Sequence, residues 1–176
     1  MQYMRAHGNT PGPTQRPMLA GALTGGLAET ASALALWYSG ALDSLTRALG
    51  IGAWPVLALH FAATVAAGAL YGRVFSRAAN DRRGGWLFGI SYGFLLWLLG
   101  PATVLQWVLS NPLAVGVAAM GMLGAHLVYG LVLGLVFPWI HALLQCELSK
   151  AEQTKDPRKL YGARPEAGIG PGGARR

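Results

Sequence analysis

The chain has 176 residues, of which 53% are hydrophobic and only 12% are charged, about half the charged fraction of an ordinary soluble domain. This composition argues against a water-soluble globular fold. The single cysteine, Cys146, cannot form an internal disulfide, and no Cys/His spacing is typical of a zinc site. The net charge is +7, but the basic residues flank apolar segments, so we expect them to set membrane topology and expect no nucleic-acid partner.

Four apolar segments are long enough to cross a bilayer, which takes about 20 residues. They run from about 17 to 38, 53 to 72, 85 to 108 and 112 to 137. Prolines mark their ends, because Pro17, Pro55 and Pro112 suit first turns and Pro138 is expected to close the fourth segment. Pro101 predicts a kink in the third segment, where the Thr103 hydroxyl is available for a freed carbonyl. The predicted fold class is all-α, an integral membrane four-helix bundle.

The distribution of basic residues predicts the orientation of the spans. Thirteen of the 14 Lys and Arg residues fall before the first span, between the second and third, or after the fourth. Because the side richer in Lys and Arg is cytoplasmic, both termini are expected in the cytoplasm, with an outer loop over residues 39–52 and a tight outer turn at 110–112. The membrane domain is expected over residues 16–146, between disordered cytoplasmic tails at 1–15 and 147–176.

The second half of the chain resembles the first at an offset of 64 to 66 residues. This match predicts two tandem helical hairpins, a parallel repeat. Small residues recur at every fourth position of each span, and such positions share one helix face. We therefore expect close helix packing along seams that include Gly21, Gly25, Gly68, Gly72, Gly89, Gly93, Gly130 and Gly134.

Three stretches of these spans resemble a known family. They are AHLVYGLVLG at 125–134, GISYGFLLWLLGP at 89–101 and HFAATVAAGALYG at 60–72. Histidine-led, glycine-spaced second and fourth helices of this kind are similar to those of a family of small bacterial four-span membrane proteins of unknown function. The resemblance covers about residues 17–140. It implies a multi-pass protein of the bacterial inner membrane and supplies no activity to carry over.

Three ionisable residues lie deep in the predicted spans, where such side chains are costly and need a reason. Glu29, His60 and His126 each lie thirteen residues from a predicted cytoplasmic boundary, about 20 Å at 1.5 Å per residue. They are therefore expected to share one buried layer. Each also lies on the small-residue seam of its helix, the face that is expected to meet neighbouring helices.

The residues alone leave three interpretations of this layer open. In the first, protonated Glu29 and two neutral histidines bond to one another or to Thr30, Ser32, Thr64 or backbone carbonyls, and so fix the register of the bundle. In the second, Glu29, kept protonated at neutral pH by burial, exchanges its proton with a histidine during transport. In the third, the three side chains bind a metal, or the histidines bind haem.

No catalytic group is expected, because no base lies at triad-like spacing from a serine and no acidic pair is present. We expect a non-enzymatic membrane component or accessory subunit with no cofactor. A proton-coupled transporter or channel-like protein is the alternative, followed by a metal- or haem-binding membrane protein. The expected partners are the lipid bilayer and either another membrane protein or further copies of the chain.

Overall fold

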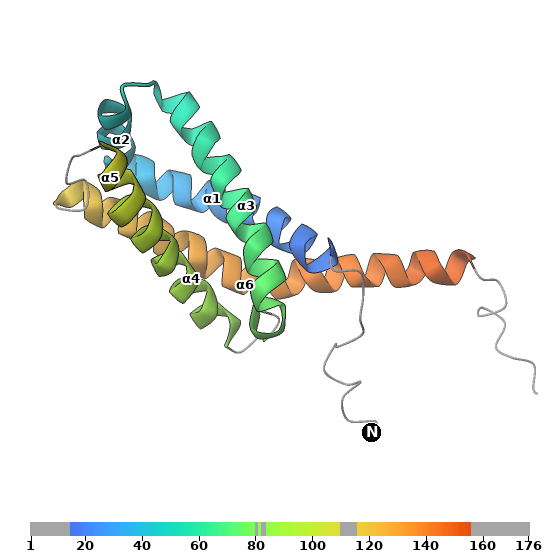
Figure 1. Cartoon of the computed structure of the whole chain (residues 1–176). Coiled ribbons are helices and arrows are strands. Elements are labelled where there is room, and N and C mark those ends of the chain that lie inside the picture. Colours follow the sequence, from blue (N-terminus) through green and yellow to red (C-terminus); the bar gives the residue numbers. More distant parts are fainter. Residues whose placement is uncertain (1–14, 80, 82–83, 110–115, 156–176) are drawn as a thin grey trace, which may run out of the picture.

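The computed structural model describes residues 15–79, 81, 84–109 and 116–155, which are almost entirely helical (Figure 1). Its helices are α1 (Gln15–Tyr38), α2 (Ala41–Leu49), α3 (Ala53–Ala79), α4 (Gly85–Leu99), α5 (Gln106–Leu109) and α6 (Val117–Lys155), with a π-helical segment, η2 (Gly100–Leu105), between α4 and α5. Four stretches are long and apolar enough to cross a membrane, namely Pro17–Tyr38, Ala53–Ser76, Gly85–Leu105 and Val117–Cys146. The all-α fold class is therefore confirmed, and the four stretches fit a multi-pass membrane protein.

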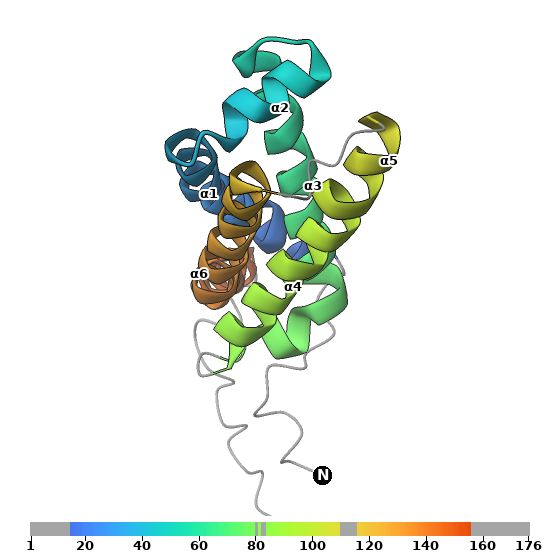
Figure 2. The ribbon, with the colours of Figure 1, turned by 90° about the vertical axis from the view of Figure 1, so that its left-hand side faces the viewer.

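The four long helices form two hairpins. α1 packs along α3, α4 packs along α6, and the two hairpins join where α1 packs along α6. Figure 2 shows α1 and α6 on one side of the bundle and α3 and α4 on the other. α3 and α4 meet through the rings of Tyr71, Phe75 and Tyr92, and Figure 1 shows them diverging towards α2 and α5.

The predicted glycine seams are the closest contacts between helices. A β-carbon on Gly25 would lie 2.8 Å from the Thr64 carbonyl oxygen and 3.1 Å from the Gly68 Cα. In the second hairpin, a β-carbon on Gly89 would collide with Gly130 and lie 2.7 Å from the Gly134 Cα. Real β-carbons are not found so near backbone atoms, so these crossings require glycine. Gly21, Gly68, Gly72, Gly93, Gly130 and Gly134 likewise leave no room for a β-carbon.

Two apolar clusters lie along the bundle. The first is formed by Ala20, Ala28, Tyr71, Tyr92, Tyr129, Leu133 and Phe137. The second, towards α2, is formed by Leu36, Ala41, Leu42, Leu45, Val56, Met122 and Ala125. On α1, α3 and α6 the polar residues Glu29, His60 and His126 fall between the two clusters, so the polar layer has apolar packing on both sides.

The second and fourth spans end later than predicted, at Ser76 and Cys146, and the third ends earlier, at Leu105. Two further features differ from the prediction. The predicted outer loop contains α2, which is held against the second cluster by buried Leu42 and Leu45. Pro138 does not end the fourth helix, because α6 runs through it to Lys155, past the predicted domain boundary at residue 146. A proline can remain inside a helix of a membrane protein where packing compensates for the lost hydrogen bond. Here Pro138 is buried beside Phe137 of the first cluster.

The remainder of both predicted tails, and the predicted turn at 110–112, lie outside the described residues.

The predicted break at Pro101 is present. Pro101 lies in η2, where the helix widens from α to π geometry, the usual form of a local bulge in a long helix. The Thr103 hydroxyl donates a 2.7 Å hydrogen bond to the Leu98 carbonyl. The acceptor lies three residues before the proline and is not the Trp97 carbonyl, which loses its α-helical partner because Pro101 has no N–H.

Large aromatic side chains are exposed near the ends of the spans. Trp37, Tyr38, Trp54, Trp107 and Trp139 are each more than 60% exposed, and Trp86 is exposed as well. Amphipathic rings concentrate at membrane–water interfaces. This distribution fits a bilayer whose boundaries lie near the ends of the four apolar helices.

Candidate functional site

Glu29 is buried in the bundle, with only 3% of its surface exposed. Its Oε1 atom lies 2.7 Å from Nδ1 of His60, and the two atoms share a hydrogen bond between α1 and α3. The bond forms because Gly25, one turn from Glu29, and Gly68, two turns from His60, let the two backbones touch on the side of the first cluster. Close packing of small residues therefore positions the only carboxyl group in the four predicted spans.

His60 connects Glu29 to the second hairpin. Its ring meets the ring of His126 edge to face, with centroids 5.8 Å apart and planes at 87°. The structure therefore brings together the three residues that the sequence placed in one layer. The His60 side chain is 18% exposed, whereas that of Glu29 is 4% exposed, so His60 is the more accessible partner of the ion pair or neutral pair.

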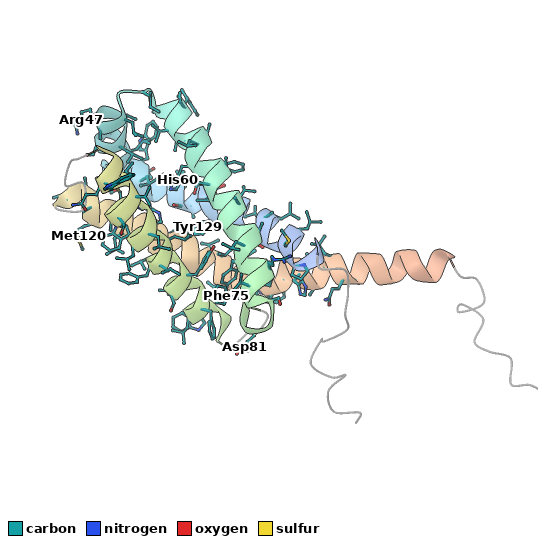
Figure 3. All side chains as sticks on the ribbon, viewed as in Figure 1. Arg47, His60, Phe75, Asp81, Met120 and Tyr129 are labelled. Carbon is teal, nitrogen blue, oxygen red and sulfur yellow. The ribbon has the colours of Figure 1, made fainter. Side chains whose placement is uncertain are left out.

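His126 is anchored to its own helix. Its Nδ1 lies 2.8 Å from the Met122 carbonyl oxygen. A carbonyl oxygen only accepts hydrogen bonds, so Nδ1 of His126 carries the hydrogen, and a neutral ring has its lone pair on Nε2. The Nε2 atoms of His60 and His126 form no hydrogen bond to a described residue. Figure 3 labels His60 beside α3, with Tyr129 further towards Phe75, which packs against the first cluster.

Hydroxyl groups beside this layer bond to helix carbonyls instead of to the histidines. Tyr129 donates to the Thr64 carbonyl at 2.6 Å, and Tyr92 donates to the Ala67 carbonyl at 2.8 Å. Thr64 donates within its own helix to the carbonyls of His60 and Phe61, at 3.0 and 2.9 Å. Of the partners that the first interpretation left open, the structure shows Glu29 bonded to His60 and His126 bonded to a backbone carbonyl. Thr64 bonds within its own helix, and Thr30 is exposed.

Three buried polar atoms close to this layer have no hydrogen-bond partner within the described part of the chain: Glu29 Oε2, Ser32 Oγ and Trp97 Nε1. Ser32 lies one turn beyond Glu29 on the same face of α1. Trp97 lies one turn beyond Gly93, and a β-carbon on Gly93 would collide with the His126 carbonyl. Sequence analysis did not select Trp97. Its place on the same four-residue stripe as Gly85, Gly89 and Gly93 was the signal that could have found it.

The layer does not form a ready metal centre. Among the residues that the structure describes, no three His, Cys, Asp or Glu side chains are grouped as metal ligands would be. The Glu29–His60 hydrogen bond also occupies one ligand atom of each side chain. Metal and haem binding by Glu29, His60 and His126 therefore stay untested predictions.

A second buried histidine lies at the other end of the bundle. His141 follows Pro138 on α6 and is 8% exposed. Its ring stacks on Phe137, with centroids 5.5 Å apart and planes at 10°, and its Nδ1 has no partner among the described residues. His141 is buried because α6 continues past Pro138, so the turn that follows the proline still packs against the first cluster through Ile140 and Leu144.

Comparison with known proteins does not extend this description. No protein-family model, curated protein or solved structure matches the chain. The resemblance to small bacterial four-span proteins thus stays a prediction, and the site alone carries the functional argument.

Proposed function

We propose that this protein is a small proton-coupled transporter or channel-like membrane protein in which Glu29, His60 and His126 bind and transfer protons. The observation that carries this proposal is the 2.7 Å hydrogen bond between Glu29 and His60 in the middle of an apolar bundle. Ionisable groups inside membrane domains typically mark ion or proton paths. A purely structural pair would use its remaining polar atoms, whereas Oε2 of Glu29 has no partner among the described residues.

The charge balance around Glu29 supports the same proposal. The four apolar stretches contain one other charged residue, Arg73. Arg73 is exposed beside Met18, on the far side of the first cluster from the polar layer. Among the described side chains, the Glu29 carboxylate therefore has no Lys or Arg partner, so a proton, a protonated histidine or a bound cation has to balance its charge. A carboxylate whose charge must be balanced by a proton or another cation is suited to bind and release protons.

The geometry allows a short proton relay through His60. A proton that reaches His60 Nε2 forms an N–H bond there and makes the ring an imidazolium. The Nδ1–H bond then breaks as an O–H bond forms on Glu29 Oε1, 2.7 Å away. The ring is again neutral, with its hydrogen now on Nε2. His126, in edge contact with His60, accepts the next proton through its own Nε2. The Nε2–H bond of His60 breaks in that step as Glu29 returns its proton to Nδ1, so His60 stays neutral and His126 becomes an imidazolium.

Proton flux into vesicles tests this function. The purified chain would be placed in liposomes that contain a pH-sensitive dye, and a potassium diffusion potential would drive protons inward. We expect protein-dependent acidification, which Glu29→Gln and His60→Gln reduce at least about tenfold, the scale of a lost general acid–base group. Asp43→Asn, which removes an exposed carboxylate on α2, is the matched control and should leave the flux unchanged.

Equal flux in protein-free liposomes and in liposomes with the native protein would overturn the proposal.

A role as an accessory subunit is the second candidate, and the arrangement of α3 and α4 favours it. In an apolar 18-residue stretch of each of these two spans, only 17% is buried inside the protein. The corresponding share in the span formed by α1 is 44%. Two diverging, exposed apolar helices suit a partner helix as well as lipid. Partners that co-purify in mild detergent, together with absent proton flux, would favour this function over transport.

We also infer that the two hairpins are copies of one unit in a bacterial inner membrane with both termini cytoplasmic. The equivalence of contacts supports the duplication, since Gly25 meets Thr64 and Gly68 as Gly89 meets Gly130 and Gly134. The matching pair His60 and His126 then meets at the boundary between the two copies. The excess of basic residues on one side supports the orientation.

A further inference from the structure

The polar layer has more free hydrogen-bond acceptors than donors. Glu29 Oε2 is an acceptor without a partner within the described ranges, and the Nε2 atoms of neutral His60 and His126 are acceptors whose Nδ1 atoms are already bonded. The free groups that can donate are the Ser32 hydroxyl and the Trp97 indole N–H. A ligand that complements the three acceptors carries several N–H or O–H donors and a positive charge, and the Ser32 hydroxyl can also accept from it, whereas the Trp97 N–H can only donate.

We propose that Glu29, His60, His126, Ser32 and Trp97 form a binding site for ammonium or a small primary amine in its cationic form. This inference rests on the proposed transport function and names the class of its solute. The ammonium group would donate to Glu29 Oε2 and to the two histidine Nε2 atoms. The negative charge of Glu29 would balance the cation.

The spacing of the acceptors favours a hydrogen-bonding cation over a bare metal ion. Metal–nitrogen and metal–oxygen bonds of about 2.0–2.2 Å would require three ligands in close convergence, and the described residues contain no such group. Hydrogen bonds to an ammonium nitrogen are about 2.9 Å long, so the same acceptors can lie further apart. The 5.8 Å separation of the two histidine rings fits this looser geometry.

Trp97 and Ser32 extend the site towards the second cluster. Long side chains on a helix lean towards its N-terminus, so the Trp97 ring leans from α4 towards the level of Gly93 and His126. It packs against the cluster that contains Met122 and Ala125, which flank His126 on α6. The apolar surface of this ring suits the short alkyl group of an amine. Access is from the side of His60, the most exposed of the three ionisable residues.

Thermal unfolding of the full chain in detergent tests the site with defined probes. Methylammonium and ammonium chloride would be compared with tetramethylammonium chloride, which has no N–H donor, and with sodium chloride at the same ionic strength. A probe at a hundred times its Kd should raise the Tm by about 5 °C. We expect this shift with methylammonium or ammonium only. A larger shift with methylammonium would identify an amine, and a larger shift with ammonium would identify the free ion.

Two variants keep the test decisive if Glu29→Gln fails to fold. Ser32→Ala removes a hydroxyl without a partner in the described structure, so it should not lower the Tm without a probe. Trp97→Phe also removes ring volume that packs against the second cluster, so it should lower the Tm without a probe. Ser32→Ala should reduce the methylammonium shift at least about twofold, as expected for a lost hydrogen bond to a charged group. Trp97→Phe should keep most of the shift, because the indole N–H can only donate and an ammonium group does not accept. Asp43→Asn should keep the full shift. No shift with either N–H probe, or the same shift with tetramethylammonium, would overturn the proposed ligand class.

The proton-flux measurement without any amine separates this inference from the proposed function. Proton flux without a methylammonium shift overturns the ligand class and leaves proton transfer supported. A methylammonium shift without proton flux overturns proton transport and supports a cation-binding site.

Discussion

A β-carbon on Gly93 would collide with the carbonyl oxygen of His126, so α4 and α6 touch backbone to backbone beside the buried histidine. The position that matches Gly93 in the first hairpin is Glu29, whose carboxyl group bonds to His60. His60 therefore lies against a carboxyl group. His126, its counterpart in the second hairpin, lies where α4 presents a glycine with no side chain. This difference makes the polar layer asymmetric and assigns the ionisable pair to the first hairpin.

Gly93→Ala should destabilise the bundle, because the new methyl group meets backbone atoms that cannot rotate away. Overpacking of this kind typically costs about 1–3 kcal/mol, which an SDS titration of the protein in mixed micelles would measure. Gly124→Ala is the control, since nothing lies within 4 Å of its added β-carbon. That variant should be neutral, or gain up to about 1 kcal/mol from helix propensity. Similar stabilities of the two variants would contradict the close crossing.

Glu29 and His60 should be energetically coupled. Leaving one buried polar group without its partner costs about 1–3 kcal/mol, so Glu29→Leu and His60→Leu should each destabilise, and the double variant should lose less than their sum. Glu29→Gln should be milder, because the amide still forms hydrogen bonds. The His60→Leu/His126→Leu double variant should also lose less than the sum, by a smaller margin, since those rings meet without a hydrogen bond.

The matched cycle for this coupling pairs Glu29→Leu with Thr103→Val. Thr103 bonds to Leu98 in η2, away from the polar layer. That pair should be additive within about 0.3–0.5 kcal/mol. Additivity of the Glu29 and His60 variants would remove the shared layer and leave two groups that are satisfied separately.

Tyr129→Phe should weaken the joint between the two hairpins. The Tyr129 hydroxyl lies on α6 and donates to the Thr64 carbonyl on α3 at 2.6 Å. Its removal should cost about 1 kcal/mol, measured by the same SDS titration. Tyr38→Phe is the control, because Tyr38 is 85% exposed and should change the stability by less than about 0.5 kcal/mol. A neutral Tyr129→Phe variant would show that this bond does not hold the hairpins together.

Cys146 offers a direct test of orientation. It is the single cysteine of the chain, and its side chain is exposed. A membrane-impermeant maleimide should leave it unlabelled in intact cells and label it after permeabilisation. In a Cys146→Ser background, Arg47→Cys on α2 should react in intact cells, because its loop lies on the side with a single basic residue. Labelling of Cys146 from outside would reverse the predicted topology.

Local chain properties were sufficient to predict the spans, the glycine seams and the shared level of Glu29, His60 and His126. The rise and period of a helix are properties of the backbone alone, so the length of an apolar segment and the residues on one of its faces can be derived by counting. The Pro101 break followed for the same reason, since it depends on neighbours within one or two turns.

Only the tertiary structure decided which helices meet. It joined the hairpins through α1 and α6 and left α3 and α4 apart over part of their length. That arrangement selects the partner of each polar atom. His126 bonds to Met122, whereas Ser32 and Trp97 have no partner among the described residues. Such choices depend on the sum of many packing contacts between distant segments, and a pattern within one segment does not contain them.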